Sequence, residues 1–399
     1  MAVTTAIPGQ IAPPAPPVAG TRARALTTRF ADFWLLGGAS LLVWLVMFSL
    51  QGFRAAWAID QHFKNLTVTT ASLSLLVNYP HFLISYKLAY SRGRSFILEH
   101  WWQMLFVPLA MIAVFAWAYT QYAIPVGELP VIVQLRQLLA PLGTNAQLLS
   151  GPRLGDVLVG LTFDVMLFTV GWHYTKQTFG CTMVYAYFDQ YPMTPRQRTI
   201  VKWSLLSVWW LTFADGNRQS GRQAFSQFAY YSFDMPDIAV PIGWLLLVGG
   251  VALTLHQVVW KNYKELGRLP SANMAVPYVA LLAWWLPITR QSEFYFLLTP
   301  FFHSLQYLTF VYKMEDTRIR GLSHPEVRGS LVAIGVVVAG WLAFEFVPNE
   351  VDTALGTFNA WQMFFFFTAA MLFINIHHYF LDNVLWRFKD PQVRQYLLG

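Results

Sequence analysis

Long apolar runs separated by short polar loops constrain the fold of this chain more than any other feature. A helix of about 20 apolar residues crosses the hydrocarbon core of a bilayer. Hydrophobic residues make up 56% of the 399 residues and charged residues only 12%, a balance typical of polytopic membrane proteins. We therefore predict an all-α membrane protein with about ten transmembrane helices in one bundle. The predicted spans lie near residues 33–51, 68–90, 102–123, 157–187, 200–215, 238–260, 274–289, 294–313, 329–347 and 358–384.

The predicted bundle is flanked by two short tails. Residues 1–30 are rich in Pro and Ala and cannot bury a core, so we expect this tail to be disordered. Residues 31–387 form the predicted transmembrane helical domain, and residues 388–399 form a short cytoplasmic tail. The apolar run from Phe33 is too long for a typical signal-peptide core and lacks an obvious small-residue cleavage site. We expect it to remain in the protein as the first span.

The distribution of Lys and Arg indicates the orientation. Cytoplasmic loops of membrane proteins are enriched in these residues. If ten helices alternate in direction, the basic clusters fall on one side, and both termini are then cytoplasmic, as in a bacterial inner-membrane protein. The clusters are Arg22/Arg24/Arg29, Arg92/Arg94, Arg196/Arg198/Lys202, Lys261/Lys264/Arg268, Arg318/Arg320/Arg328 and Arg387/Lys389/Arg394. Because this pattern accounts for the net charge of +7, we predict no nucleic-acid partner.

Two segments on the opposite side have patterns of their own. The residues from Leu129 space their apolar side chains like a short amphipathic helix, which would lie on the membrane or pack on the bundle. The residues from Ser220 are too polar for a span, and we interpret them as a lid.

Four of the apolar runs contain histidine, at His81, His173, His303 and the adjacent pair His377 and His378. An ionisable side chain within a span is costly, so it usually faces a cavity or a partner rather than lipid. A single such histidine is more often a hydrogen-bonding contact between helices than a metal ligand. Four histidine-bearing helices together favour one shared polar centre.

The depth of these histidines can be counted from the next cytoplasmic basic residue. His81 precedes Arg92 by 11 residues, His303 precedes Lys313 by 10, and the pair begins 10 residues before Arg387. At about 1.5 Å per residue, this is roughly 15 Å, near the middle of a hydrocarbon core about 30 Å thick. The sequence therefore predicts a common depth for three of the four helices.

The depth of His173 is left open by the sequence, because Lys176 follows after only three residues. Either the span ends near Lys176 and His173 lies at the interface, or the helix continues and Lys176 is buried with it. In the second case Lys176 is a functional candidate.

Side chains three or four positions away share a helical face with these histidines. Asp382 follows His378 by four residues and would act as a ligand or, as we slightly favour, orient the ring through its second nitrogen. Adjacent helical residues point about 100° apart, so the pair at 377 and 378 cannot bind as one face. The candidate metal ligands are His81, His173, His303, His377, His378 and Asp382, and the candidate catalytic residues are Lys176 and Tyr307.

The donor types limit the chemistry. Cys181 is the only cysteine, so one chain offers no thiolate cage and the ligands are nitrogen and oxygen. We expect iron first, with zinc or copper as alternatives. The predicted function is an oxidoreductase of the oxygenase, hydroxylase or desaturase type, acting in the lipid bilayer on a lipid or other hydrophobic small molecule. No nucleotide or flavin fingerprint is present, so electrons would come from an external donor.

The intramembrane histidines resemble in kind those of intramembrane polyhistidine oxygenases, such as carotenoid-cleaving and lipid-hydroxylating or desaturating enzymes. The clustered HxxxH and HxxHH boxes of the hydroxylase and desaturase group are absent, so no residue role is carried over. Two other classes stay open: a haem-binding electron carrier with axial histidines, and a proton-coupled transporter that uses the histidines as a relay with Asp382 and Lys176. A metalloprotease is disfavoured because HExxH is absent.

Overall fold

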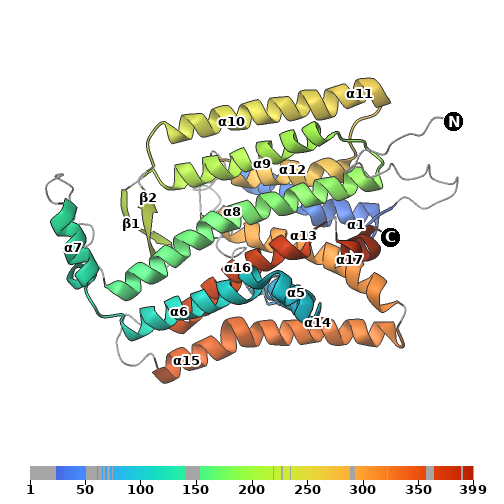
Figure 1. The fold of residues 1–399 in the computed structure, drawn as a ribbon. Helices are drawn as coiled ribbons and strands as arrows, with labels where there is room; N and C mark the ends of the chain where they lie inside the picture. Colours follow the sequence, from blue (N-terminus) through green and yellow to red (C-terminus); the bar gives the residue numbers. More distant parts are fainter. Residues whose placement is uncertain are drawn as a thin grey trace, which may run out of the picture.

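A computed structural model describes most of the chain as helices, with one short hairpin (Figure 1). The described residues are 24–50, 75–139, 153–218, 220–225, 228–233, 235–287, 293–320, 322–355, 364–387 and 390–398, together with 61, 65, 68, 69, 72 and 73. Residues 1–23 of the predicted tail, residues 288–289 and 358–363 of two predicted spans, and part of 66–74 lie outside this set. The expected disorder of residues 1–23 therefore stays a prediction.

The elements alternate between long helices and short connecting turns. In chain order they are α1 (Arg29–Phe33), η1 (Trp34–Gly38), α2 (Ala39–Leu50), α4 (Asn78–Tyr90), α5 (Arg94–Glu99), η3 (Trp102–Phe106), α6 (Val107–Thr120), η4 (Val126–Glu128), α7 (Pro130–Leu139), α8 (Leu154–Phe188), α9 (Pro195–Gly216), β1 (Ser220–Phe225), β2 (Phe228–Phe233), α10 (Ala239–Thr254), η7 (Leu255–Trp260), α11 (Lys261–Leu266), α12 (Ala272–Trp285), α13 (Glu293–Ile319), α14 (Pro325–Trp341), η9 (Leu342–Phe346), α15 (Val347–Leu355), α16 (Phe365–Leu385), α17 (Pro391–Val393) and η11 (Arg394–Leu398).

Five helices in the described part of the chain are long and apolar enough to cross a membrane, which indicates a membrane protein. They are Arg29–Leu50, Trp102–Thr120, Leu154–Phe188, Ala239–Leu266 and Pro325–Leu355. The sequence predicted about ten such helices. Most residues of these five are not buried within the bundle, as expected for helices whose outer faces meet an apolar surrounding.

The remaining predicted spans are shorter or more polar. Helices α4 and α12 have only 13 and 14 residues. Helices α9, α13 and α16 have 22, 27 and 21 residues, but their polar side chains keep them below the apolar criterion. Three of these five, α4, α13 and α16, carry candidate histidines. A helix enclosed by others can hold polar side chains, because these find partners inside the bundle.

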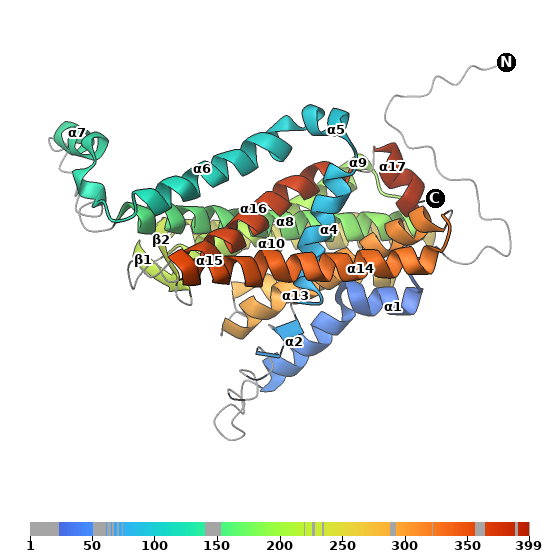
Figure 2. The same cartoon turned by 90° about the horizontal axis from the view of Figure 1, so that it is seen from below.

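Helix α8 runs through the middle of the bundle (Figures 1 and 2). Helices α9 and α10 lie on one side of it in Figure 1, and α14 and α15 lie beyond α16 on the other. Helix α4 packs against α13, α14 and α16. The contact between α4 and α14 needs a glycine, since a Cβ added at Gly340 would lie 2.6 Å from the Cβ of Tyr79. Helix α4 thus lies beside two other histidine-bearing helices, α13 and α16.

Polar contacts hold the loops at one end of the bundle, where α1 and α17 lie in Figure 1. Arg29 forms an ion pair with Asp189, and Arg268 donates a 2.9 Å hydrogen bond to the backbone oxygen of the same aspartate. Arg92 forms an ion pair with Asp390. Basic clusters that are far apart in the sequence thus gather at one end.

The two segments singled out between spans form small elements. The amphipathic segment forms α7, which stands away from the bundle in both views. The segment interpreted as a lid forms the antiparallel hairpin β1–β2, with Ser220 paired to Phe233, and β2 lies against α8. The described part of the C-terminal tail packs onto α13, with Val393 and Leu397 buried in the core.

Candidate metal centre

Four helices each place one histidine at a common point inside the bundle. The histidines are His81 on α4, His173 on α8, His303 on α13 and His378 on α16. All four are buried, with exposed fractions between 0% and 6%. One ring nitrogen from each lies within 4.8 Å of the other three. The structure therefore contains a group of four imidazoles that could hold a metal ion.

The spacing within this four-histidine cluster suits a single ion. Two nitrogens that each lie about 2.0–2.1 Å from one metal are at most about 4.2 Å apart. The Nε2 atoms of His173 and His303 are 3.0 Å apart, and the four ligand nitrogens all lie within 4.8 Å of one another. Movements of the rings by up to about 1 Å would bring all four nitrogens to binding distance of one ion.

Three ring nitrogens in the cluster have no hydrogen-bond partner in the described part of the chain. They are Nε2 of His81 and both Nδ1 and Nε2 of His378. Buried polar atoms are nearly always paired, and an unpaired one costs about 1–3 kcal/mol. The other ring nitrogen of His81, Nδ1, lies 2.8 Å from the hydroxyl of Ser304. A hydrogen bond that fixes one ring nitrogen while the other points at the site is the usual support of a metal-bound imidazole.

Asp382 lies at the edge of the cluster, and its two carboxylate oxygens have different partners. Its Oδ1 accepts hydrogen bonds from Tyr307 at 2.9 Å and Ser85 at 3.1 Å. Its Oδ2 is 3.3 Å from Nε2 of His378 and 3.7 Å from Nε2 of His173. One oxygen is therefore held by hydroxyls while the other faces two imidazoles. This placement suits an orienting group or an additional ligand.

Tyr307 links the cluster to the rest of the bundle. Its hydroxyl contacts Ser85 and Asp382 and accepts a 3.1 Å hydrogen bond from the indole N–H of Trp386. Its ring lies 4.3 Å from that of His81. The hydroxyl is thus fully engaged, which indicates a supporting role for the candidate residue Tyr307.

His377 belongs to a different environment from its neighbour. Its Nδ1 lies 2.9 Å from the hydroxyl of Tyr86, and its Nε2 lies 3.0 Å from the backbone oxygen of Gln103. Both ring nitrogens therefore have protein partners outside the cluster. The structure brings His378, but not the candidate His377, to the other three histidines, because adjacent helical positions face different helices.

The position of His173 is resolved by the length of α8. The helix has 35 residues and continues 12 residues beyond Lys176, so His173 lies near its middle rather than at its end. Lys176 is half-buried, contacts Asn383, and its Nζ lies 4.3 Å from the ring centre of Trp172. Of the two alternatives for this segment, the structure has the continuous helix.

Some supporting residues were not identified from the sequence. Ser304 partners His81 from another helix, although it is the direct neighbour of His303 and so lies off that residue's face. Trp386 lies eight residues after His378 and donates a hydrogen bond to Tyr307. Helical spacing along one chain segment could not reveal these two, because the contacts cross between helices.

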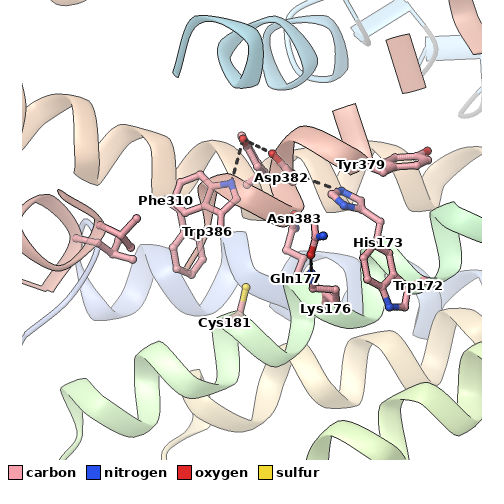
Figure 3. Close-up of a pocket in the computed structure, with 14 residues that line it drawn as sticks. Trp172, His173, Lys176, Gln177, Cys181, Phe310, Tyr379, Asp382, Asn383 and Trp386 are labelled. Carbon is pink, nitrogen blue, oxygen red and sulfur yellow. Dashed lines mark hydrogen bonds and ion pairs between the residues drawn. The ribbon is translucent and has the colours of Figure 1, made fainter. Parts of the chain in front are cut away.

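A cavity of about 100 Å³ adjoins the cluster (Figure 3). His173, Asp382 and Tyr307 form its wall on the side of the histidines. The rest of the wall is largely apolar or aromatic, and Figure 3 shows Phe310 and Trp386 on the side away from His173. The full lining is Trp172, His173, Lys176, Gln177, Gly180, Cys181, Tyr307, Phe310, Tyr379, Asp382, Asn383, Trp386, Val393 and Leu397.

No family model, curated protein or solved structure matches this chain. Its function must therefore be inferred from the site: four converging imidazoles, a carboxylate beside them and an apolar cavity next to both.

Proposed function

We propose that this chain is an integral-membrane, metal-dependent oxidoreductase that acts on a lipid or other hydrophobic substrate. One metal ion would be held by His81, His173, His303 and His378. The observation that carries the proposal is the convergence of four buried imidazoles, three of whose nitrogens lack hydrogen-bond partners in the described residues. The adjoining cavity supplies a place for an apolar substrate.

A metal accounts for the cluster better than hydrogen bonding alone. A buried group left unpaired loses the solvation that it has in water, and nothing in the surrounding protein restores it. One ring nitrogen of His81 and one of His378 belong to the group of four that could hold a metal, and one cation there would give both of these rings a partner. In a purely structural network, we would instead expect each nitrogen to find its own partner, as those of His377 do.

We propose iron as the metal, with copper or zinc as alternatives that the same donors accept. Imidazole nitrogen suits iron, copper and zinc, and the one thiol, that of Cys181, lines the cavity instead of joining the cluster. A bound iron would supply one-electron chemistry and oxygen activation in a dry pocket. The protein's own contribution would be to hold the ring nitrogens, exclude water and keep Asp382 beside two of the rings. Electrons would come from an external donor.

The proposal includes a location and an orientation. Residues 31–387 would form the membrane domain, with α4, α9, α12, α13 and α16 packed among the five more apolar helices. The basic clusters gathered at one end support a cytoplasmic position for both termini, as in a bacterial inner membrane. Nothing in this arrangement calls for a nucleic-acid partner.

The two other classes make different use of the same residues. A haem held between two of the histidines would need its ring where the other two imidazoles lie, since all four nitrogens are within 4.8 Å of one another. A proton relay through Asp382 and Lys176 would need no metal. The metal content of the protein separates these classes.

The test is elemental analysis with an absorption spectrum on detergent-purified protein. We expect about one transition-metal ion per chain, without the intense Soret band of haem. The variants His81→Ala and His303→Ala should lose most of the bound metal, since each removes one of four ligands. His256→Ala is the matched control, because this exposed histidine of η7 lies outside the cluster. Trace metal in the parent protein, or equal metal in parent and cluster variants, would refute the metal centre.

A further inference from the structure

The cavity beside the histidine cluster contains a lysine that forms no close ion pair in the described part of the chain. Lys176 lines it, and in the described part of the chain no carboxylate lies within 4 Å of its Nζ. The half-buried Lys87 of the same bundle differs, because its Nζ lies 2.7 Å from a carboxylate oxygen of Glu315. Lys176 instead contacts the amide oxygen of Asn383 and the face of Trp172. These neutral partners leave two of its three N–H donors available.

Lys176 lies far from the end of α8, unlike a lysine at the membrane interface. It lies 12 residues before the end of α8, which is roughly 18 Å along the helix at about 1.5 Å per residue. The carboxylate of Asp382 attracts Lys176 from beyond 4 Å, but its close contacts are two hydroxyls on Oδ1 and two imidazoles next to Oδ2. A charge at this depth is expected to serve a ligand or a partner.

The cavity has an apolar wall beyond the lysine and a partly exposed side. Phe310, Val393 and Leu397 are buried apolar residues of the wall. Trp172, Lys176 and Gly180 follow one another at intervals of four residues along α8, and all three are partly exposed. These positions mark the open side of the cavity. A Cβ added at Gly180 would meet no heavy atom within 4 Å, so this side of the cavity has open space next to the helix.

We propose that this cavity binds a long-chain carboxylate, with the carboxylate on Lys176 and the chain along the wall formed by Phe310, Val393 and Leu397. The charge of Lys176 selects the anionic end, and the apolar wall selects the chain. Because His173 precedes Lys176 by one helical turn, on the side away from Gly180, the carboxylate end is the end nearest the histidine cluster. The inference rests on the proposed function in that this molecule would be the substrate.

The test measures binding of radiolabelled dodecanoate and of its methyl ester to purified protein in nanodiscs of zwitterionic lipid. The parent should bind the acid at least about tenfold more tightly than the ester, the scale of one charge-assisted hydrogen bond. Lys176→Met should lose this preference, whereas Lys176→Arg should keep much of it. Lys264→Met is the matched control, because it removes an exposed positive charge of α11 that lies outside the cavity.

A second variant tests the cavity without touching the lysine. Gly180→Leu places a side chain in open space on α8, so the fold should tolerate it while both the acid and the ester bind more weakly. Equal affinity of the parent for acid and ester, or a preference that survives in Lys176→Met, overturns the inference. Unchanged binding of both ligands in Gly180→Leu also counts against it.

Metal content, measured on the same samples, separates this inference from the proposed function. Acid preference without metal would leave the carboxylate site standing and remove the oxidoreductase. Bound metal without a preference for the acid would support the metal centre and remove the carboxylate site.

Discussion

His377 and His378 are adjacent on α16 and equally buried, yet their ring nitrogens differ in hydrogen bonding. Both ring nitrogens of His377 are matched, by the hydroxyl of Tyr86 and the backbone oxygen of Gln103. Neither ring nitrogen of His378 has a hydrogen-bond partner in the described structure, although three other histidines surround it. Burial alone therefore does not identify a metal ligand. A better indication of a metal ligand is a ring nitrogen that has no hydrogen-bond partner and lies close to the nitrogens of other histidines.

This contrast has an energetic meaning. The hydrogen bonds of His377 offset the cost of placing its ring in the interior, so the residue stabilises the packing of α16 against α4 and η3. The three unpaired nitrogens of the cluster would each cost about 1–3 kcal/mol without a ligand. One ion bound to the cluster would remove that cost for one nitrogen of each ring that it binds, and so make the fold more stable when loaded.

The largest expected effect comes from replacing each histidine of this pair by alanine in turn. His378→Ala should lose most of the bound metal, because it removes one of four ligands and leaves a gap in the cluster. His377→Ala should keep its metal but unfold more easily, by about 1–3 kcal/mol, because Tyr86 and Gln103 lose their buried partner. Metal per chain and thermal unfolding of both variants provide the measurement. Loss of metal in His377→Ala alone would reverse our assignment.

A smaller effect is expected at Asp382, which lies beside two rings of the cluster. Asp382→Asn keeps the size of the side chain and can still accept hydrogen bonds from Tyr307 and Ser85. We expect metal affinity to fall by about 10–100-fold, the usual effect of losing a carboxylate that supports the ligands. Competition with a chelator measures the affinity. Complete loss of metal would instead make Asp382 a ligand, and no change would remove it from the centre.

The smallest effect is expected at Ser304, the partner of His81 Nδ1. Ser304→Ala leaves all four imidazoles in place but frees one ring to turn, so metal affinity should fall by about tenfold. Ser207→Ala is the control, since this buried serine of α9 donates only to the backbone oxygen of Ser204. Equal chelator competition curves for the two variants would show that Ser304 does not position His81.

Much of the architecture follows from local sequence patterns. The apolar runs predicted the long helices, and His81, His303 and the pair on α16 were assigned a common depth from the basic residues that follow them. The apolar criterion is met by five helices rather than ten because α9, α13 and α16 carry polar side chains and α4 and α12 are short. The hairpin β1–β2 follows no simple apolar period, so it was recognised only as a non-spanning segment.

The sequence by itself determined that this chain forms a bundle of apolar helices with histidines on four of them, because transfer of a helix into an apolar surrounding depends on its own composition. Only the tertiary structure decided which histidines meet, that α8 carries His173 and Lys176 within one continuous helix, and that Ser304 supports His81. The reason is physical: hydrogen bonding and metal binding act over about 2–3 Å, and the atoms within that range belong to other helices.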